Sequence, residues 1–474
     1  MNHIMKEKNS NKINFQKWWS LQQKKSLLRF LTCGNVDDGK STLIGRLLYE
    51  INEVYVDQLL SLNNNLKFDY NQKELIDFSL LVDGLQAERE QGITIDVAYR
   101  YFSTNTKKFI IADSPGHKQY TRNMATAASH SDVSVILIDA QKGLTNQTCR
   151  HSLISSMLGI KYFIIAINKM DLVNFKENIF QKIKSNFLIF SKNLPVIPKI
   201  YFVPISALLG DNIINISNNM PWYTGKTLIN TLEGIDIFSG YNEKDLIFPI
   251  QYVNRLDKKD RFYCGTLLSG KLFVGKKIKT LFTQSYSKIS KIITFDSDLQ
   301  TVDEYLPISL VLEDDIDLSR GDILIDPSAK FITSRSALLN IIWMSENPLF
   351  LNQKYKIKIL GKITTIIIKN IFYEINADTL KQNTTSQLSL NSIGLIEIIF
   401  EEPIFINSYY LHKYLGGIIF IDILTNMTVG AGMVKKCNYH LASKKNNYYN
   451  SFELELNKLI CKFFPDWNVK NINN

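Results

Sequence analysis

The segment that decides the fold lies at residues 34–41 and reads Gly34-Asn35-Val36-Asp37-Asp38-Gly39-Lys40-Ser41. It matches the pattern Gly-x-x-x-x-Gly-Lys-[Ser/Thr], and it stands between an apolar run and a helix-like pattern. Glycines let the backbone curl so that successive N–H groups point at phosphate oxygens, and the following helix adds positive potential at its N-terminus. We therefore predict a phosphate site that extends to Thr42, in which Lys40 reaches the β- and γ-phosphates and the Ser41 hydroxyl binds Mg²⁺.

On both sides of this loop, short apolar runs alternate with helix-like patterns as far as about residue 232. Such alternation is typical of a parallel sheet that is covered by helices on both faces. We expect this α/β part to be a P-loop domain. The predicted strands are Ser26–Cys33, 109–113, Val133–Asp139 and Tyr162–Asn168, and the predicted helices are residues 41–51, 119–129 and 146–158.

Two further motifs stand in the order that a nucleotide switch requires. Asp113-Ser114-Pro115-Gly116-His117 closes a predicted strand, where Asp113 can hold Mg²⁺ through water and the Gly116 N–H can sense a γ-phosphate. Upstream, Gly92-Ile93-Thr94-Ile95 offers Thr94 as a second hydroxyl ligand for Mg²⁺. Thr94 would hold its loop in place only while the γ-phosphate is present. Taken alone, this second motif could equally be the start of a strand.

His117 follows the Pro-Gly pair of the switch motif directly. A single histidine is commonly a packing or surface residue, but a side chain at this position can orient the water that attacks the phosphate. We therefore predict that His117 is catalytic, together with Lys40 and Thr94.

The identity of the base is predicted from Asn168-Lys169-Met170-Asp171, which ends another apolar strand. A carboxylate such as Asp171 can accept the N1–H and 2-amino donors that guanine has and adenine lacks, while the stem of Lys169 covers the ring. A polar site built for such donors can reject the other base by a factor of about 10⁴. Farther along the chain, Ser206-Ala207-Leu208 suits a backbone contact with the guanine O6. The predicted nucleotide is therefore GTP, bound with Mg²⁺.

The second half of the chain has a different character, with short strands separated by turn residues. Closely spaced strands with Gly, Asn and Asp turns favour β-barrels, and the length allows two of them. Residues 451–464 have the apolar spacing of an amphipathic helix. We expect a multidomain α/β plus all-β chain, with a GTP-binding domain at residues 1–240, barrels at 241–332 and 333–440, and a helical tail at 441–474.

The chain has 55 Lys and Arg against 45 Asp and Glu, which gives a net charge of +10 over 474 residues. A basic balance can indicate nucleic-acid binding. Here, however, the lysines are dispersed, and the whole sequence is rich in Asn, Ile, Lys and Tyr. Compositional drift is therefore the preferred explanation, and we expect no DNA ligand.

Five cysteines are too far apart for a disulfide framework or a zinc site: Cys33, Cys149, Cys264, Cys437 and Cys461. The polar N-terminus lacks the apolar core of a secretory signal, and no run of about 18 apolar residues occurs. These observations predict a cytoplasmic protein that does not associate with a membrane.

The motifs together resemble those of the translational-type GTPases, and more closely those of the GTPase subunits of bacterial two-subunit sulfate adenylyltransferases. The resemblance covers nearly the whole chain. It rests on Phe30-Leu31-Thr32-Cys33-Gly34 with residues 36–48, on Asp83-Gly84-Leu85-Gln86-Ala87-Glu88-Arg89-Glu90-Gln91-Gly92 within residues 81–102, on Phe420-Ile421-Asp422 and on Thr425-Asn426-Met427-Thr428-Val429-Gly430-Ala431-Gly432-Met433.

This resemblance implies a GTP-binding domain followed by two β-barrels, in a hetero-oligomer with a separate catalytic subunit, the ATP sulfurylase. That partner would form adenylyl sulfate and pyrophosphate from ATP and sulfate, and GTP hydrolysis on this chain would drive the reaction. Asp37 matches a position that holds a monovalent cation in related GTPases, so K⁺ is a further candidate ligand. The 42 residues after Gly432 are too few for the fused adenylyl-sulfate kinase of some relatives.

Two alternatives remain open from the sequence. A carrier of aminoacyl-tRNA would use the same GTPase domain and barrels, and the positive charge mildly favours it. Binding of tRNA through several phosphates would weaken steeply with salt. A degenerate subunit is the other alternative, and the intact phosphate, switch and base motifs argue against it.

Overall fold

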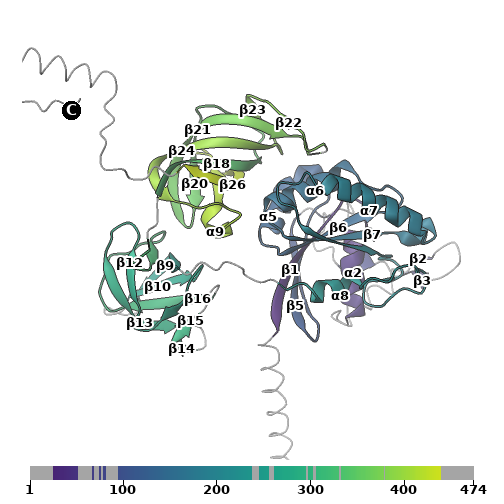
Figure 1. Cartoon of the computed structure of the whole chain (residues 1–474), viewed down its shortest axis with the longest axis horizontal. Coiled ribbons are helices and arrows are strands. Elements are labelled where there is room, and N and C mark those ends of the chain that lie inside the picture. The colour runs from purple at the N-terminus through teal and green to yellow at the C-terminus, as the bar shows by residue number, and fades with distance from the viewer. Residues whose placement is uncertain are drawn as a thin grey trace, which may run out of the picture.

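The computed structural model describes residues 25–51, 67–68, 74–75, 78–81, 94, 96–236, 245–255, 261–294, 297–302, 306–329, 333–377 and 379–438. Within these residues the chain forms an α/β domain and two separate sets of strands (Figure 1). The predicted fold class is confirmed. Gly92, Ile93 and Ile95 of the predicted switch and the predicted helix at 451–464 lie outside the described residues.

The α/β domain is built on a six-stranded sheet in the order β4-β5-β1-β6-β7-β8. Five strands are parallel, and every residue of β6 is buried, because helices cover both faces of the sheet. The parallel strands are β1 (Ser26–Cys33), β5 (Lys107–Asp113), β6 (Val133–Asp139), β7 (Tyr162–Asn168) and β8 (Lys199–Pro204).

One edge of this sheet carries an antiparallel strand in addition to the parallel strands. Strand β4 (Ala98–Ser103) pairs with β5 in the antiparallel direction, with Phe102 opposite Phe109. Phe102 is buried while its neighbour Tyr101 is 68% exposed. One face of this strand is therefore exposed to solvent, and buried and exposed residues alternate along it. Such an edge strand lacks the continuous apolar run by which the other strands were predicted.

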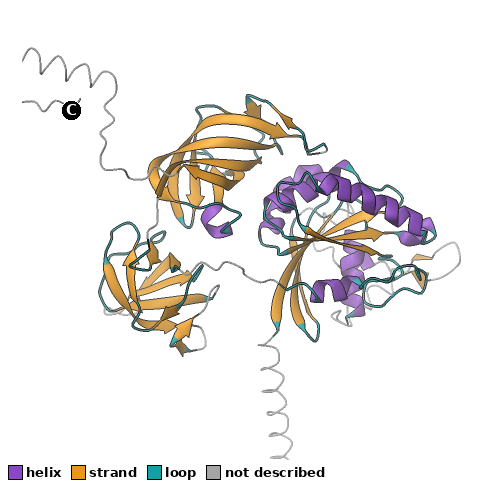
Figure 2. Ribbon diagram, in the orientation of Figure 1, coloured by secondary structure: helices purple, strands orange, loops and turns teal. Residues whose placement is uncertain are grey.

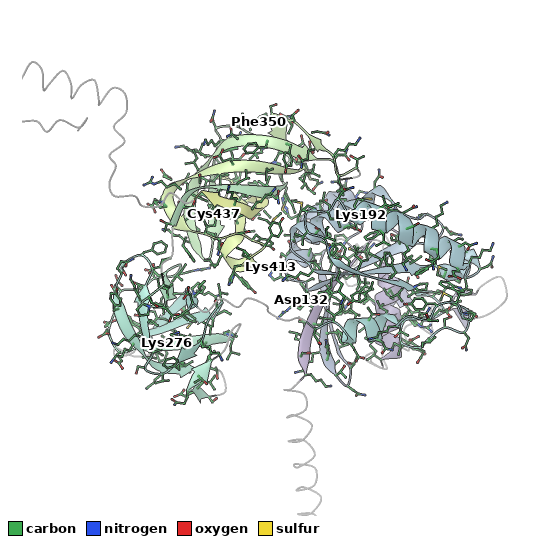
Figure 3. The ribbon with its side chains drawn as sticks, in the orientation of Figure 1. Asp132, Lys192, Lys276, Phe350, Lys413 and Cys437 are labelled. Atoms are coloured by element: carbon green, nitrogen blue, oxygen red, sulfur yellow. The ribbon has the colours of Figure 1, made fainter. Side chains whose placement is uncertain are left out.

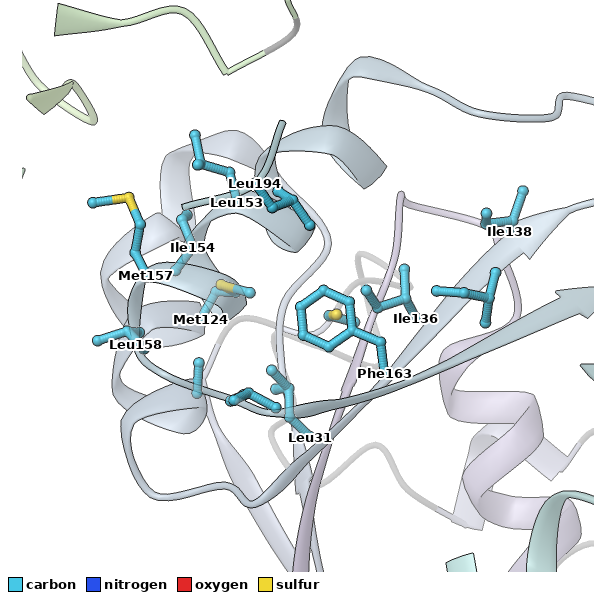
Figure 4. Packing of buried hydrophobic residues seen from close by; sticks show 14 of the residues in the cluster. Leu31, Met124, Ile136, Ile138, Leu153, Ile154, Met157, Leu158, Phe163 and Leu194 are labelled. Atoms are coloured by element: carbon cyan, nitrogen blue, oxygen red, sulfur yellow. The ribbon is translucent and has the colours of Figure 1, made fainter. Parts of the chain in front are cut away.

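Helices form a layer on each face of the sheet (Figure 2). On one face, Ile136 and Phe163 pack against α5, α6 and α7, as seen in Figure 4. On the other face, Val135 and Ile164 pack with α2 and α8. The helices are α2 (Lys40–Glu50), α5 (Thr121–Ser129), α6 (Asn146–Met157), α7 (Glu177–Ser191) and α8 (Leu228–Glu233), with the short 3-10 turns η1 (Phe78–Leu81), η2 (Lys118–Tyr120) and η3 (Met170–Val173).

The second domain is a closed barrel of six antiparallel strands. Its ring runs β12-β17-β9-β10-β16-β13 and closes through the pairing of β12 with β13. The ring strands are β9 (Ile247–Arg255), β10 (Arg261–Thr266), β12 (Lys277–Thr280), β13 (Tyr286–Ile293), β16 (Pro307–Leu312) and β17 (Ile323–Ile325); the short strands are β11 (Leu272–Phe273), β14 (Asp298–Leu299) and β15 (Thr301–Val302).

The third domain is a second closed barrel, in the ring order β20-β25-β26-β18-β24-β21. Its core centres on Trp343, Phe400 and Phe420, all at most 2% exposed. The ring strands are β18 (Thr333–Trp343), β20 (Lys354–Ile359), β21 (Lys362–Ile375), β24 (Ile393–Phe405), β25 (Gly417–Ile421) and β26 (Thr428–Asn438); the short elements are β19 (Leu349–Phe350), β22 (Gln382–Asn383), β23 (Gln387–Leu388) and α9 (Lys413–Gly416).

The third domain packs against α5 and α6 of the α/β domain. Met157 and Leu158 share one apolar cluster with Tyr409 of the barrel, and the Tyr409 hydroxyl donates to the Leu158 carbonyl at 3.2 Å. Beside this contact, Lys413 and Asp132 face each other across the boundary (Figure 3). Burial lowers the pKa of Lys413 and raises that of Asp132, and their mutual attraction opposes both shifts.

The helices of the described residues are too short or too polar to cross a membrane. A two-residue strand pair, β2 (Lys67–Phe68) with β3 (Glu74–Leu75), completes the described elements.

Candidate nucleotide-binding site

The phosphate loop leaves β1 at Gly34 and enters α2 at Lys40, as predicted. Its backbone is held in a tight curve, because the Asn35 N–H donates to the Asp38 carboxylate at 2.7 Å. The Lys40 ammonium donates to the carbonyl oxygens of Asn35 at 2.8 Å and Gly34 at 3.3 Å. Burial lowers the pKa of Lys40, and the carboxylates of Asp113 and Asp38 oppose that shift. The cation is thus held inside the loop that would cradle the phosphates.

Gly39 is required by a close approach from the base motif. Its φ of +90° is a left-handed conformation, and a Cβ at this position would collide with the Asn168 side-chain amide. That amide donates to the Asp38 carbonyl at 2.8 Å and accepts from the Ala207 N–H at 2.9 Å. Asn168 therefore joins the phosphate loop, the base motif and residues 206–208 in one network.

The switch motif lies directly on the phosphate loop. Asp113 is fully buried at the end of β5, where it accepts from the Thr32 hydroxyl at 3.1 Å. The Ser114 hydroxyl donates to the Thr32 carbonyl at 2.7 Å, and Pro115 is buried beside it. A Cβ on Gly116 would stand 2.6 Å from the Lys40 nitrogen, so glycine is the residue that permits this approach.

The residues fit a nucleotide with Mg²⁺. Ser41 and Thr42 are half-buried in the first turn of α2, whose N-terminus favours anions. Gly39 and Gly116 let the base and switch motifs approach the phosphate loop, because a Cβ on either glycine would collide with the Asn168 amide or the Lys40 ammonium. Among the described residues no cluster of three or more His, Cys, Asp and Glu side chains could hold a metal alone. The ion would therefore depend on hydroxyls, one carboxylate and the nucleotide itself.

Two predicted residues are less closely connected to this site. Thr94 is half-buried, and in the described part of the chain no hydrogen bond joins it to Ser41. His117 is exposed at the end of the switch motif, where its Nδ1 accepts from the Gln119 N–H at 3.3 Å. Its ring centroid lies 6.2 Å from that of Tyr120.

Two hydrogen bonds connect the base motif to the segment at residues 205–206. The Ser206 hydroxyl donates to Asp171 at 2.6 Å, and the Met170 N–H donates to the Ile205 carbonyl at 3.2 Å. Leu208 is partly exposed at the outer end of this loop. Asp171 and the Ala207 N–H are thereby fixed on neighbouring segments, as a contact with both edges of a guanine requires.

Asp139 is a site residue that the sequence analysis missed. It is 1% exposed, and it forms an ion pair of 2.9 Å with the Lys169 ammonium. Lys169 has a φ of +61°, and this ion pair orients the stem that would cover the base. A signal was present, because Asp139 ends the run that forms β6 and stands opposite Asn168 in the register of the parallel sheet.

A surface cleft of about 520 Å³ lies apart from these motifs. It is lined by α7, β8 and residues 222–225, and no residue of the phosphate, switch or base motifs contributes to it. The candidate site is therefore identified by the phosphate, switch and base motifs that come together there, and not by the size of a cleft.

Comparisons with known proteins show similarity to GTP-binding proteins along nearly the whole chain. Residues 25–286 match the family model described as the elongation factor Tu GTP binding domain, and residues 336–435 match the GTP-eEF1A C-terminal domain-like model. The chain is 49% identical over 472 residues to a sulfate adenylyltransferase subunit 1 of Erwinia tasmaniensis, covering 100% of this chain and 99% of the relative. The protein of the same name from Buchnera aphidicola is 50% identical, over 97% of this chain and 98% of the relative.

A solved structure is also similar. The S. cerevisiae Ski7 GTPase-like domain bound to GTP has a TM-score of 0.48 and 19% identity, over 88% of this chain and 98% of that chain.

Proposed function

The chain belongs to the sulfate adenylyltransferase subunit 1 family and carries a GTP-binding domain of the elongation factor Tu type, and on this premise we propose that it is the GTP-hydrolysing subunit of a sulfate adenylyltransferase. Its catalytic partner would form adenylyl sulfate and diphosphate from ATP and sulfate. GTP hydrolysis would supply the free energy for this unfavourable step in sulfate assimilation. The observation that carries the proposal is the network through Asn168, which connects the phosphate and base motifs in a chain that matches these relatives along its length.

In this proposal the residues of the phosphate loop bind the nucleotide and hold it for attack. Backbone N–H groups of residues 34–42 cradle the phosphates, and Lys40 releases its two loop carbonyls to bind the β- and γ-phosphates. The Ser41 and Thr94 hydroxyls, with Asp113, would hold Mg²⁺, which would supply positive charge against the charge that develops on the phosphates. His117 orients the attacking water, and its exposed position leaves it free to turn inward.

The base site would select guanine. Asp171 would accept the N1–H and 2-amino donors, and the Lys169 stem would cover the ring. The Ala207 N–H, which donates to the Asn168 side-chain oxygen at 2.9 Å in this structure, would exchange that acceptor for O6 when guanine binds. The Asp139 ion pair and the Ser206 hydrogen bond hold the first two of these side chains in place.

We propose domain limits near residues 240, 332 and 440. Strand β17 ends at Ile325 and β18 begins at Thr333, which supports the middle limit. The proposal also assigns the chain to the cytoplasm, where it would form a hetero-oligomer with the catalytic subunit.

K⁺ is a further proposed ligand, near Asp37. This exposed residue has a φ of +66° in the phosphate loop, and the proposal rests on its match to the position that holds a monovalent cation in related GTPases. GTP hydrolysis should then be faster in KCl than in a chloride of a bulky organic cation at equal ionic strength. Equal rates would end this proposal.

The deciding experiment is co-expression with the catalytic subunit, followed by an assay of pyrophosphate release from ATP and sulfate. We expect release that requires GTP, that a non-hydrolysable GTP analogue does not support, and that the Lys40→Ala variant abolishes. The isolated chain should hydrolyse GTP slowly, because unaided P-loop GTPases can be as slow as about 10⁻⁴ per second. GTP-independent release, or rapid hydrolysis by the isolated chain, would contradict the coupling.

The rival function, carriage of aminoacyl-tRNA, has less support, because the relatives above carry the name sulfate adenylyltransferase subunit 1. Binding of tRNA that weakened steeply between about 50 and 200 mM salt would favour the rival.

A further inference from the structure

Arg46 holds the loop that follows the base-reading residues. It lies in α2, six positions after Lys40, and its two terminal nitrogens donate to the carbonyls of Leu208 at 3.3 Å and Leu209 at 3.0 Å. Its Nε donates to the Glu50 carboxylate at 2.6 Å. All three nitrogens of one guanidinium therefore donate a hydrogen bond. Two of these bonds bring Arg46 together with Leu208 and Leu209, and Leu208 is 162 positions away in the sequence.

The Leu208 and Leu209 carbonyls directly follow Ser206 and Ala207, which belong to the proposed base site. The Ser206 hydroxyl bonds to Asp171, and the Ala207 N–H is fixed by Asn168. Gly210 closes the loop against the guanidinium, and a Cβ there would overlap both Arg46 and Glu50. The loop from 206 to 210 is thus held at its start by the base motif and at its end by Arg46.

The same guanidinium also contacts the segment that leads toward Thr94. Its central carbon lies 5.0 Å from the centroid of the Phe78 ring, and Phe78 is only 3% exposed. This ring belongs to η1, which packs against α2 so closely that a Cβ on Gly45 would collide with the Phe78 carbonyl. Arg46 therefore connects α2, the base loop and η1 at one point.

Lysine could not replace this arginine. An ammonium has three donors on a flexible stem, whereas the planar guanidinium presents its donors in a rigid fork and can stack on a ring at the same time. The side chains of Arg46 and Glu50 are only 20% and 17% exposed, so water competes little for the ion pair between them. The two bonds to the Leu208 and Leu209 carbonyls lie nearer the surface.

We propose that Arg46, supported by Glu50, is a positioning residue for guanine recognition. It fixes the 206–210 loop to the helix that begins with Lys40 and Ser41, so that the base and the phosphates are held in register. This inference rests on the GTP-binding role proposed above, but it does not depend on sulfate chemistry or on a partner subunit.

The test compares the full chain with Arg46→Ala, Arg46→Lys and Glu50→Gln by calorimetric titration with GTP, ATP and inorganic triphosphate, which lacks a base. Both Arg46 variants should lose about tenfold to a hundredfold in GTP affinity, because the loop loses two charge-assisted hydrogen bonds. Their preference for GTP over ATP should shrink by a similar factor, while the affinity for triphosphate stays within about twofold. Glu50→Gln keeps an acceptor and should lie between these variants and the wild type.

Steady-state hydrolysis supplies a second readout. The KM for GTP should rise in the Arg46 variants, with kcat at saturating GTP within about threefold. Arg335→Lys, the same change on an exposed arginine of β18, is the matched control and should leave all values unchanged. Equal loss of GTP and triphosphate affinity would show a general loss of structure and overturn the proposal. Full rescue by lysine would also overturn it. A wild-type chain with no preference for GTP would remove the proposed function itself.

Discussion

Asn168 uses both ends of one short amide, donating to the Asp38 carbonyl and accepting from the Ala207 N–H. A carboxylate at this position could accept but not donate, so it would repel the Asp38 carbonyl. The geometry therefore requires an amide, and the length of asparagine sets the distance between the phosphate loop and the base loop. Residues of this kind couple two parts of a ligand site without a direct role in the chemistry.

Asp171→Asn should change which base is preferred. The wild-type carboxylate would accept two donors of guanine, whereas an amide would supply a donor that suits the 2-oxo group of xanthine. We expect GTP affinity to fall by about a hundredfold or more, with XTP preferred in its place. Competitive titration of the two nucleotides against a fluorescent GDP analogue measures the ratio. An unchanged preference for GTP would exclude Asp171 as the residue that reads the base.

His117→Ala should separate binding from hydrolysis. The side chain is exposed and touches no phosphate-loop residue in the described hydrogen bonds, so GTP affinity should stay within about twofold. The hydrolysis rate should fall about tenfold or more if the imidazole orients water. Single-turnover hydrolysis with labelled GTP checks this, and Gln119→Ala, an exposed neighbour, is the control. Equal turnover in the His117 variant would remove the proposed role.

At the scale of single elements, α6 contains a buried histidine beneath the site. His151 is 2% exposed; burial, with smaller effects from the charges of Lys40 and Arg150, lowers its pKa from 6.5 to about 3. Below about pH 6.5 the unfolded chain therefore binds a proton that the folded chain does not bind until about pH 3. Folding stability must fall as the pH falls through this window.

His151→Gln should remove this dependence. At pH 5 the unfavourable linkage amounts to about 2 kcal/mol, and at pH 7.5 it is nearly zero. Urea unfolding of wild type and variant at both pH values should therefore show a stability difference that shifts by about this amount in favour of the variant at the lower pH. Any constant cost of the substitution cancels in that comparison. Parallel pH profiles would contradict the buried, neutral state of His151.

The helices and strands that the sequence predicted are those with an unambiguous period. β6 and β7 occupy the predicted residues because helices cover both faces, which demands an unbroken apolar run. β4 was not predicted because an edge strand alternates between buried and exposed residues. β8 was not predicted because Lys199 and Tyr201 interrupt its apolar pattern. A run of apolar residues predicts a strand that is buried on both faces, and this prediction is least certain for strands that are only partly buried.

Site residues divide in the same way. The motif residues were predictable because their spacing is fixed by a single loop. The ion pair of Asp139 with Lys169 and the hydrogen bonds of Arg46 with Leu208 and Leu209 join distant segments. The partners of such contacts become visible only when strand order and helix position are known. For Asp139 the sequence held only the signal that it ends the apolar run of β6, and for Arg46 it held none.

At the scale of the whole molecule, the α/β domain and the third domain share one apolar cluster. Tyr409 is 5% exposed at its centre and bonds to the end of α6. The Arg122 guanidinium, on α5, adds a hydrogen bond of 2.9 Å to the Met344 carbonyl of the barrel. Because α5 follows the switch motif directly, this boundary lies close to the part of the site that would respond to the γ-phosphate.

Tyr409→Ala should uncouple the two domains. Truncation of a buried aromatic side chain costs about 3–5 kcal/mol, and here the loss falls on the boundary. We expect calorimetry to show an earlier first transition and a wider separation between the unfolding of the two domains. Tyr414→Ala, which removes a 57% exposed ring from the neighbouring α9, should change the melting profile little. An unchanged profile for the Tyr409 variant would show that the boundary contributes no stability.

The closure of both barrels has a consequence for behaviour in concentrated solution. A closed ring offers no row of unpaired backbone groups to another chain, whereas the six-stranded sheet ends in β4 on one side and β8 on the other. In the part of the chain that the structure describes, no further strand pairs with β4, and this strand also exposes Tyr99 and Tyr101. Aggregation by strand pairing should therefore start on the nucleotide-binding domain, and a bound nucleotide that stabilises this domain should delay it.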